Sequence, residues 1–144
     1  MRHLRLKLTE YDENRATPGF TLFSPLSRPM TYLMNMEGEV VHEWTLPGIP
    51  GGYARLLPNG NLFYSAQTEV GPAFAGGAQG GLMREVDWDG NVISEYVDNF
   101  QHHDCRRLEN GNIVYAGWEI MPEYAAARVQ GGVPGTDLPD GNYV

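Results

Sequence analysis

The sequence has a single cysteine, few basic residues and no long hydrophobic run. The one thiol, Cys105, excludes a disulfide bond within the chain. Free cysteines are mostly buried, which favours a place inside a strand, but neighbouring histidines and arginines leave a reactive thiol of lowered pKa as an alternative. The 10 basic residues are outnumbered by 18 acidic ones, and the formal net charge is -8. This charge argues against nucleic acid as a partner, because phosphates require a basic surface.

Membrane and export signals are also missing. No segment approaches the roughly 18 consecutive apolar residues of a membrane-spanning helix, so we expect no membrane partner. Residues 1–8 are basic but lack the apolar core and small-residue cleavage site of a signal peptide. If Met1 is the true start, this predicts a cytoplasmic protein; if the natural N-terminus lies upstream, a periplasmic location is the alternative.

Turn-forming residues are abundant. The chain contains 18 glycines and 10 prolines without a collagen-like period, which is typical of an all-β protein with many turns. Its 144 residues are enough for one domain with a hydrophobic core.

The sequence repeats itself with a period of about 51 residues. Residues 55–66 (RLLPNGNLFYSA) match residues 106–117 (RRLENGNIVYAG), and residues 36–44 (MEGEVVHEW) match residues 88–96 (WDGNVISEY). Each copy therefore contains two hairpins, one with an acidic-Gly turn and one with an Asn-Gly turn. The four predicted turns lie at Glu37-Gly38, Asn59-Gly60, Asp89-Gly90 and Asn110-Gly111.

Four strands that recur every 40–50 residues are typical of β-propeller blades. We therefore predict two four-stranded antiparallel units, at about residues 31–66 and 83–118, within an incomplete propeller domain at residues 19–144. Residues 1–18 are expected to form an arm or an edge strand. The chain would supply about two to three blades, so we expect the remainder of a longer propeller, or self-association, to cover its open strand edges.

Three other segments give simpler expectations. The Gly/Ala-rich residues 69–81 are interpreted as a connecting loop or as a lid over a site. Alternating charges at residues 84–91 favour an outer strand. Residues 121–129 favour one or two helical turns after Pro122, and Asp140-Gly141 indicates a further turn.

One polar cluster is not required by the repeat. His102-His103-Asp104 aligns with Gly51-Gly52-Tyr53, so this position of the framework does not need histidine or aspartate. His102, His103 and Asp104 are therefore the candidate catalytic residues, and Arg106 and Arg107 are candidates for binding substrate. A neutral imidazole can act as a nucleophile, a carboxylate can fix its tautomer, and a neighbouring cation can stabilise anionic oxygens.

The order of these motifs resembles the arylsulfotransferase (aryl-sulfate sulfotransferase) family of bacterial β-propellers. The resemblance covers about residues 19–119 and rests on residues 19–23 (GFTLF), 32–44 (YLMNMEGEVVHEW), 54–62 (ARLLPNGNL) and 102–112 (HHDCRRLENGN). It implies a six-bladed propeller with its site in a central channel. It also implies sulfuryl transfer from a phenolic sulfate ester to another phenol, without a nucleotide sulfate donor or other cofactor. A histidine would take the group covalently, while other histidines and an arginine stabilise the sulfate.

Several alternatives stay open on the sequence alone. Strand alternation would place His102, Asp104 and Arg106 on one face and His103, Cys105 and Arg107 on the other, without deciding which set faces a channel. Both histidines can instead be structural hydrogen-bond partners. A His-x-Asp metal site would be incomplete, so no metal is predicted. A non-catalytic propeller that serves as a binding or scaffold module is the main alternative function. His42 is expected to be structural, because Ser94 stands at its place in the second copy.

Overall fold

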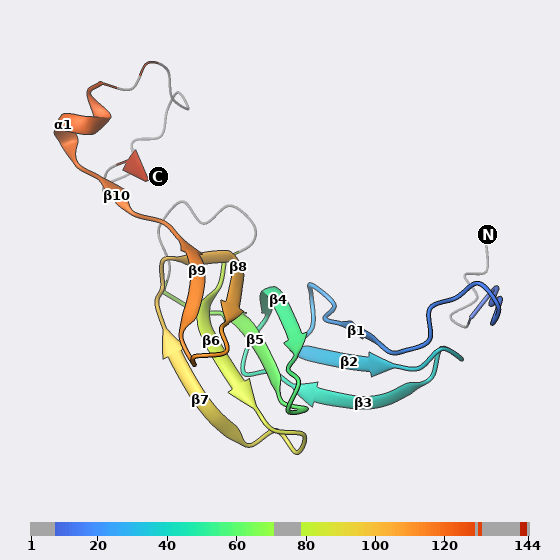
Figure 1. The fold of residues 1–144 in the computed structure, drawn as a ribbon. Helices are drawn as coiled ribbons and strands as arrows, with labels where there is room; N and C mark the ends of the chain where they lie inside the picture. Colours follow the sequence, from blue (N-terminus) through green and yellow to red (C-terminus); the bar gives the residue numbers. More distant parts are fainter. Residues whose placement is uncertain (1–7, 71–78, 129, 131–141, 144) are drawn as a thin grey trace.

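The regular secondary structure of the described residues consists almost entirely of short strands, as the sequence predicts. The structure, a computed structural model, describes residues 8–70, 79–128, 130 and 142–143 (Figure 1). The strands are β1 (Thr21–Phe23), β2 (Met30–Met34), β3 (Val40–Thr45), β4 (Pro50–Leu56), β5 (Leu62–Gln67), β6 (Gly81–Val86), β7 (Val92–Val97), β8 (Gln101–Arg107), β9 (Ile113–Gly117), β10 (Ile120–Met121) and β11 (Asn142–Tyr143). The predicted helical turn after Pro122 is α1 (Glu123–Ala126).

The strands form four antiparallel sheets. A central four-stranded sheet has the order β4-β5-β6-β7, flanked in sequence by the three-stranded sheet β1-β2-β3 and the two-stranded sheet β8-β9 (Figure 1). A small fourth sheet pairs β10 with β11. Residues 8–18 contain no strand, and the rest of the predicted arm or edge strand, residues 1–7, lies outside the described residues. Two expected features lie outside the described residues: most of the loop or lid at residues 69–81, and the turn at Asp140-Gly141.

The predicted grouping of strands into four-stranded units is wrong. The central sheet combines the second hairpin of the first unit, β4-β5, with the first hairpin of the second unit, β6-β7. A repeat reveals its period but not where one sheet ends and the next begins. Burial explains why the sheet is divided in this way. Residues 62–66 of β5 are all buried, so this strand lies inside a sheet with a paired strand on each side. Most of β3 and β7 is solvent-exposed, so these strands lie at sheet edges.

The position predicted for residues 84–91 is also wrong. β6 is an inner strand, paired with β5 on one side and β7 on the other. Its charged residues are accommodated by local partners: Arg84 forms an ion pair with Glu95 of β7, and Glu85 is buried beside Arg107. Alternating charge therefore does not mark an outer strand when one charge pairs within the sheet and the other pairs with the neighbouring β8-β9 sheet.

All four predicted turns are confirmed, and they share one geometry. In the turn that contains Asn59, the Gly60 N–H donates to the Leu57 carbonyl and the Leu57 N–H donates to the Asn61 carbonyl. The other three turns repeat this pattern, and each has a glycine with φ between 79° and 87°. This is a type I turn followed by a left-handed glycine, a three-residue loop. Asn or Asp side chains accept backbone N–H groups in each loop.

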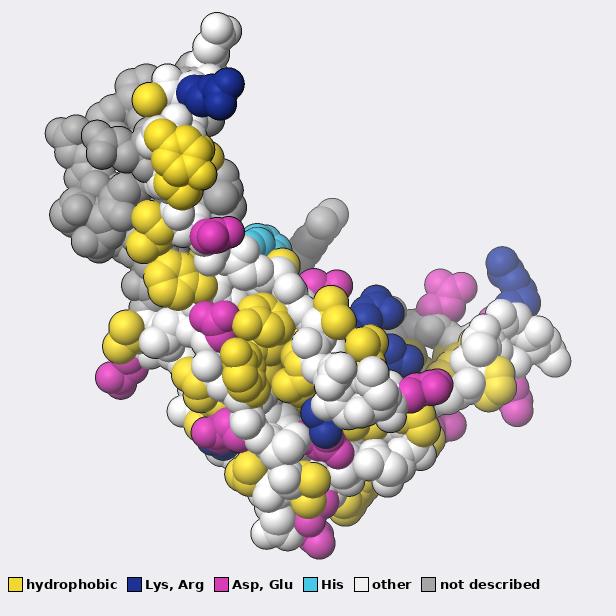
Figure 2. Space-filling view, turned by 60° about the vertical axis from the view of Figure 1, so that its left-hand side comes forward, with side chains coloured by type: hydrophobic (Ala, Val, Ile, Leu, Met, Phe, Trp, Pro, Cys, Tyr) yellow, Lys and Arg dark blue, Asp and Glu magenta, His cyan; other side chains and the backbone are white. Residues whose placement is uncertain are grey.

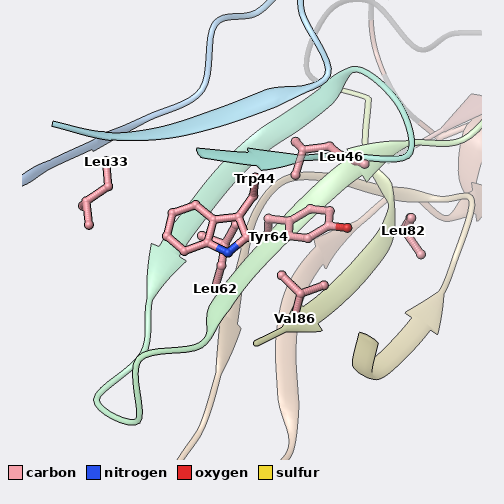
Figure 3. Close-up of a cluster of buried hydrophobic side chains, with 8 residues drawn as sticks. Leu33, Trp44, Leu46, Leu62, Tyr64, Leu82 and Val86 are labelled. Carbon is pink, nitrogen blue, oxygen red and sulfur yellow. The ribbon is translucent and has the colours of Figure 1, made fainter. Parts of the chain in front are cut away.

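The main hydrophobic core lies between the β1-β2-β3 sheet and the central sheet. Trp44, Leu62 and Tyr64 lie at its centre (Figure 3). The Trp44 indole N–H donates to the Asp87 carbonyl, and His42 Nε2 donates to the Trp88 carbonyl at 2.8 Å. His42 thus has the structural role expected of it. In the described part of the chain, no helix has the length and apolar character needed to cross a bilayer.

A second, smaller core joins the central sheet to the β8-β9 hairpin. Phe63 of β5, Met83 of β6 and Cys105 of β8 form this cluster, and all three side chains are buried. Gln101 extends the contact, because its side-chain oxygen accepts the Gly81 N–H at 2.9 Å. These contacts hold β8, the strand that carries the candidate site, against the central sheet.

Candidate functional site

The candidate residues lie on β8 at a double bulge. His102 pairs with Ala116 and Cys105 pairs with Tyr115, so His103 and Asp104 have no partner on β9. His103 has a φ of 54° and is the only described non-glycine residue with a positive φ. Such a backbone is uncommon for residues with a side chain and costs on the order of 1 kcal/mol or more.

The first copy of the repeat has a bulge at the equivalent place. On β4, Pro50 pairs with Ala66 and Ala54 pairs with Tyr64, so two extra residues are again inserted. Within this insertion Gly52, the counterpart of His103, has a φ of 102°. The framework therefore does constrain this position: it requires a left-handed residue, which is glycine in the first copy and histidine in the second.

The two bulges face each other. A Cβ atom added at Gly52 would lie 3.4 Å from the His103 carbonyl oxygen, and one added at Gly51 would lie only 2.8 Å from Ser65 Oγ. Gly51 and Gly52 therefore belong to the close packing around the histidine segment of β8.

The two histidines contact each other directly. Their Nδ1 atoms are 2.8 Å apart, and the His102 ring lies against Trp118 with a centroid distance of 4.4 Å. A hydrogen bond between two Nδ1 atoms needs one proton, so when both rings are neutral one has an unprotonated Nε2 and the other an Nε2–H. Partial burial, and secondly the neighbouring His103, hold the pKa of His102 below its usual range. With both rings neutral, the pair therefore presents one lone pair and one N–H donor.

The bulge changes the predicted faces of the strand. His102 and Arg106 do share a face, because their partners Ala116 and Val114 are two residues apart on β9. His103 and Asp104 lie in the bulge and no longer alternate with them. Within the described ranges, the Asp104 carboxylate makes no hydrogen bond to either imidazole.

The two arginines differ in their surroundings. Arg106 is exposed, whereas the Arg107 guanidinium lies 3.4 Å from Glu85 and also donates to the Gly111 carbonyl. The other oxygen of Glu85 accepts a hydrogen bond from Asn61 at 2.7 Å. The first copy has Leu33 and Leu56 where the second has Glu85 and Arg107, and both leucines contribute to the main core. Arg107 thus ties the β8-β9 hairpin to the central sheet.

Cys105 is buried, as expected, and its thiol is not activated. Burial, and secondly the Asp104 carboxylate, raise the pKa of Cys105 to about 12. The thiol is therefore protonated throughout the neutral pH range, which argues against a reactive cysteine. The described residues contain no group of three or more histidine, cysteine, aspartate or glutamate side chains that could hold a metal ion.

The strained backbone of His103 gives a testable expectation. His103→Gly should raise the free energy of unfolding by about 0.5–1 kcal/mol, because glycine adopts positive φ without strain. The matched control is His102→Gly, which places glycine at a regular strand position and should lower stability by a similar amount. Urea denaturation measures both, and a loss of stability in the two variants alike would show that His103 is unstrained.

Comparison with known proteins adds no assignment. No family model matches the chain, and neither does any curated protein sequence. The described residues define an all-β protein of antiparallel sheets with a bulge-held histidine pair, and its function must be argued from that site.

Proposed function

We propose that this chain is part of a β-propeller that transfers a sulfuryl group between phenols through a histidine. The observation that supports this most is the histidine pair on β8, with its Nδ1 atoms 2.8 Å apart. The meander order β4-β5-β6-β7 and the packing of sheets on either side of it support the propeller. The remainder of the propeller would come from a longer chain or from further copies.

The proposed reaction has two steps. The unprotonated Nε2 of one histidine attacks the sulfur of an aryl sulfate, so that an N–S bond forms and the ester S–O bond breaks, releasing a phenolate. An acceptor phenol then attacks the sulfur, the N–S bond breaks, and the phenolic proton passes to water. The neighbouring Nε2–H stabilises the sulfate oxygens in both steps.

The remaining candidate residues are assigned different roles. Arg106 is exposed on the same face as His102, which favours it as the cation for the sulfate group. Arg107 is engaged with Glu85, so we assign it to holding β8 rather than to substrate. Asp104, exposed in the bulge, is proposed to act on the site through its charge, because no hydrogen bond joins it to the described imidazoles.

The test is turnover of a chromogenic aryl sulfate with and without a phenol acceptor. The proposal predicts phenol release that depends on the acceptor, together with formation of the sulfated acceptor. His42→Gln is the matched histidine control, because glutamine retains an N–H donor toward the Trp88 carbonyl, and it should keep full activity. No turnover in the complete propeller would favour the non-catalytic binding module instead.

A further inference from the structure

The two histidines of the pair differ in how firmly the fold holds them. His102 pairs with Ala116 of β9 on one side and, through an isolated bridge, with Gln79 on the other. His103 lies in the bulge, has no partner on β9 and has a φ of 54°. His103 is also exposed, whereas His102 is half-buried, and a histidine side chain is visible at the surface in Figure 2. His102 is therefore the firmly held member of the pair.

Trp118 contacts the His102 ring directly. The two rings have a centroid distance of 4.4 Å and an interplanar angle of 34°. Trp118 follows β9, and its backbone N–H donates at 2.8 Å to the carbonyl of Phe100, the residue before β8. The first copy has the same bond at the equivalent place, where the Gln67 N–H donates to the Ile49 carbonyl. The repeated framework therefore fixes the backbone from which the tryptophan ring reaches His102.

The tryptophan side chain is not required by that framework. The first copy has Gln67 in place of Trp118 and Gly51 in place of His102. The copy that carries the histidine is thus also the copy that carries the aromatic ring against it, although the backbone bond is the same in both. The ring is therefore explained by the histidine rather than by the fold.

A nucleophile must direct its lone pair at the sulfur, because small displacements of a reacting group cost much of the rate. In the described part of the chain, only His102 combines strand pairing on two sides with an aromatic ring packed against its imidazole. If its Nε2 carries the lone pair, its Nδ1 carries the proton that it shares with His103. Partial burial, and secondly His103, lower the pKa of His102, which favours the neutral ring that nucleophilic attack requires.

We propose that His102 is the nucleophile of the pair and that Trp118 is a positioning residue that holds its ring; this inference rests on the proposed sulfuryl transfer. His102 Nε2 forms the N–S bond as the ester S–O bond breaks and the phenolate leaves. The Nδ1 proton stays on His102, and its hydrogen bond to His103 stabilises the positive charge of the sulfated ring. When the acceptor phenol attacks, the N–S bond breaks, His102 becomes neutral again and the phenolic proton passes to water.

Kinetics of tryptophan variants test the positioning role. Trp118→Ala should lower kcat for an aryl sulfate about tenfold with little change in KM, because the nucleophile loses its orientation while the substrate-binding groups remain. Trp118→Phe keeps an aromatic ring beside His102 and should retain most of the activity. The matched control is Trp88→Ala, which should leave kcat unchanged, because Trp88 stacks on a different histidine, His42, at 3.9 Å. A Trp118→Ala variant with the wild-type kcat would overturn the positioning role.

NMR spectroscopy of the imidazole nitrogens tests the assignment without any turnover. At a pH where both rings are neutral, His102 should carry its proton on Nδ1 and His103 on Nε2. Trp118→Ala should give His102 a mixture of the two tautomers, whereas Trp88→Ala should leave its tautomer unchanged. A wild-type His102 that carries its proton on Nε2 would overturn the assignment.

The position of the sulfo group gives a second criterion. Fragmentation of the sulfated peptide in the mass spectrometer should place the group on His102, and a group on His103 would overturn the assignment. A protein that turns over no aryl sulfate would refute the proposed function, whereas tautomers opposite to those expected would refute the assignment. The two failures are therefore distinguishable.

Discussion

Replacing either histidine of the pair with alanine is expected to reduce kcat/KM for an aryl sulfate by about 10²–10⁴-fold, with the larger loss for the nucleophile. His102→Ala removes the ring that lies against Trp118, and His103→Ala removes its only described imidazole partner. Either change leaves the remaining Nδ1 without its hydrogen bond, so the proton distribution that exposes a lone pair on one Nε2 is lost.

The two alanine variants are informative only in folded protein. Circular dichroism should show unchanged β structure, because both side chains lie outside the two hydrophobic clusters. The His42→Gln variant tests whether loss of any histidine lowers activity. If His102→Ala and His103→Ala fold and retain full kcat/KM, the pair is structural and the proposed site is wrong.

The second large effect concerns the Glu85-Arg107 ion pair. Arg107→Leu should lower the free energy of unfolding by about 2 kcal/mol, because it leaves a buried carboxylate without its cation. The expected loss of stability is smaller than for a fully buried ion pair, because the Arg107 side chain is 26% exposed and solvent partly screens its charge.

The repeat supplies the matched control for this prediction. The double variant Glu85→Leu/Arg107→Leu reproduces the Leu33 and Leu56 positions of the first copy, so it should recover most of the lost stability. Urea denaturation of the wild type, both single variants and the double variant completes the cycle. A double variant as unstable as the sum of the single changes would show that the two residues do not interact.

Local features of the fold were predictable because short-range chemistry decides them. The four turns follow from Asn-Gly and acidic-Gly pairs, since glycine accepts positive φ. In the Asn-Gly turns the asparagine before the glycine accepts a backbone N–H, and in the acidic-Gly turns Asn35 or Asp87 at the start of the turn does so. The phase of the sheets was not predictable from the repeat. Where one sheet ends and the next begins depends on which strands are buried on both faces. The burial of β5 and β6 becomes apparent only when the packing of the neighbouring sheets is known.

The candidate site was chosen from the sequence, but its geometry was not predicted. Aligning the copies singled out His102 and His103, whereas the alternation rule assumed a regular strand and missed the bulge. A signal was present: Gly52 aligns with His103, and a glycine within a strand often marks a bulge. The Glu85-Arg107 pair was equally detectable, because these residues align with Leu33 and Leu56 in the first copy.

The most direct test of the central claim is to look for a sulfo group on the histidine pair. The protein would be incubated with an aryl sulfate in the absence of acceptor, digested under mildly alkaline conditions and analysed by mass spectrometry. The account predicts a sulfo group on the peptide containing His102 and His103, lost when a phenol is added before digestion. An unmodified peptide from a preparation that turns over the same donor would contradict it.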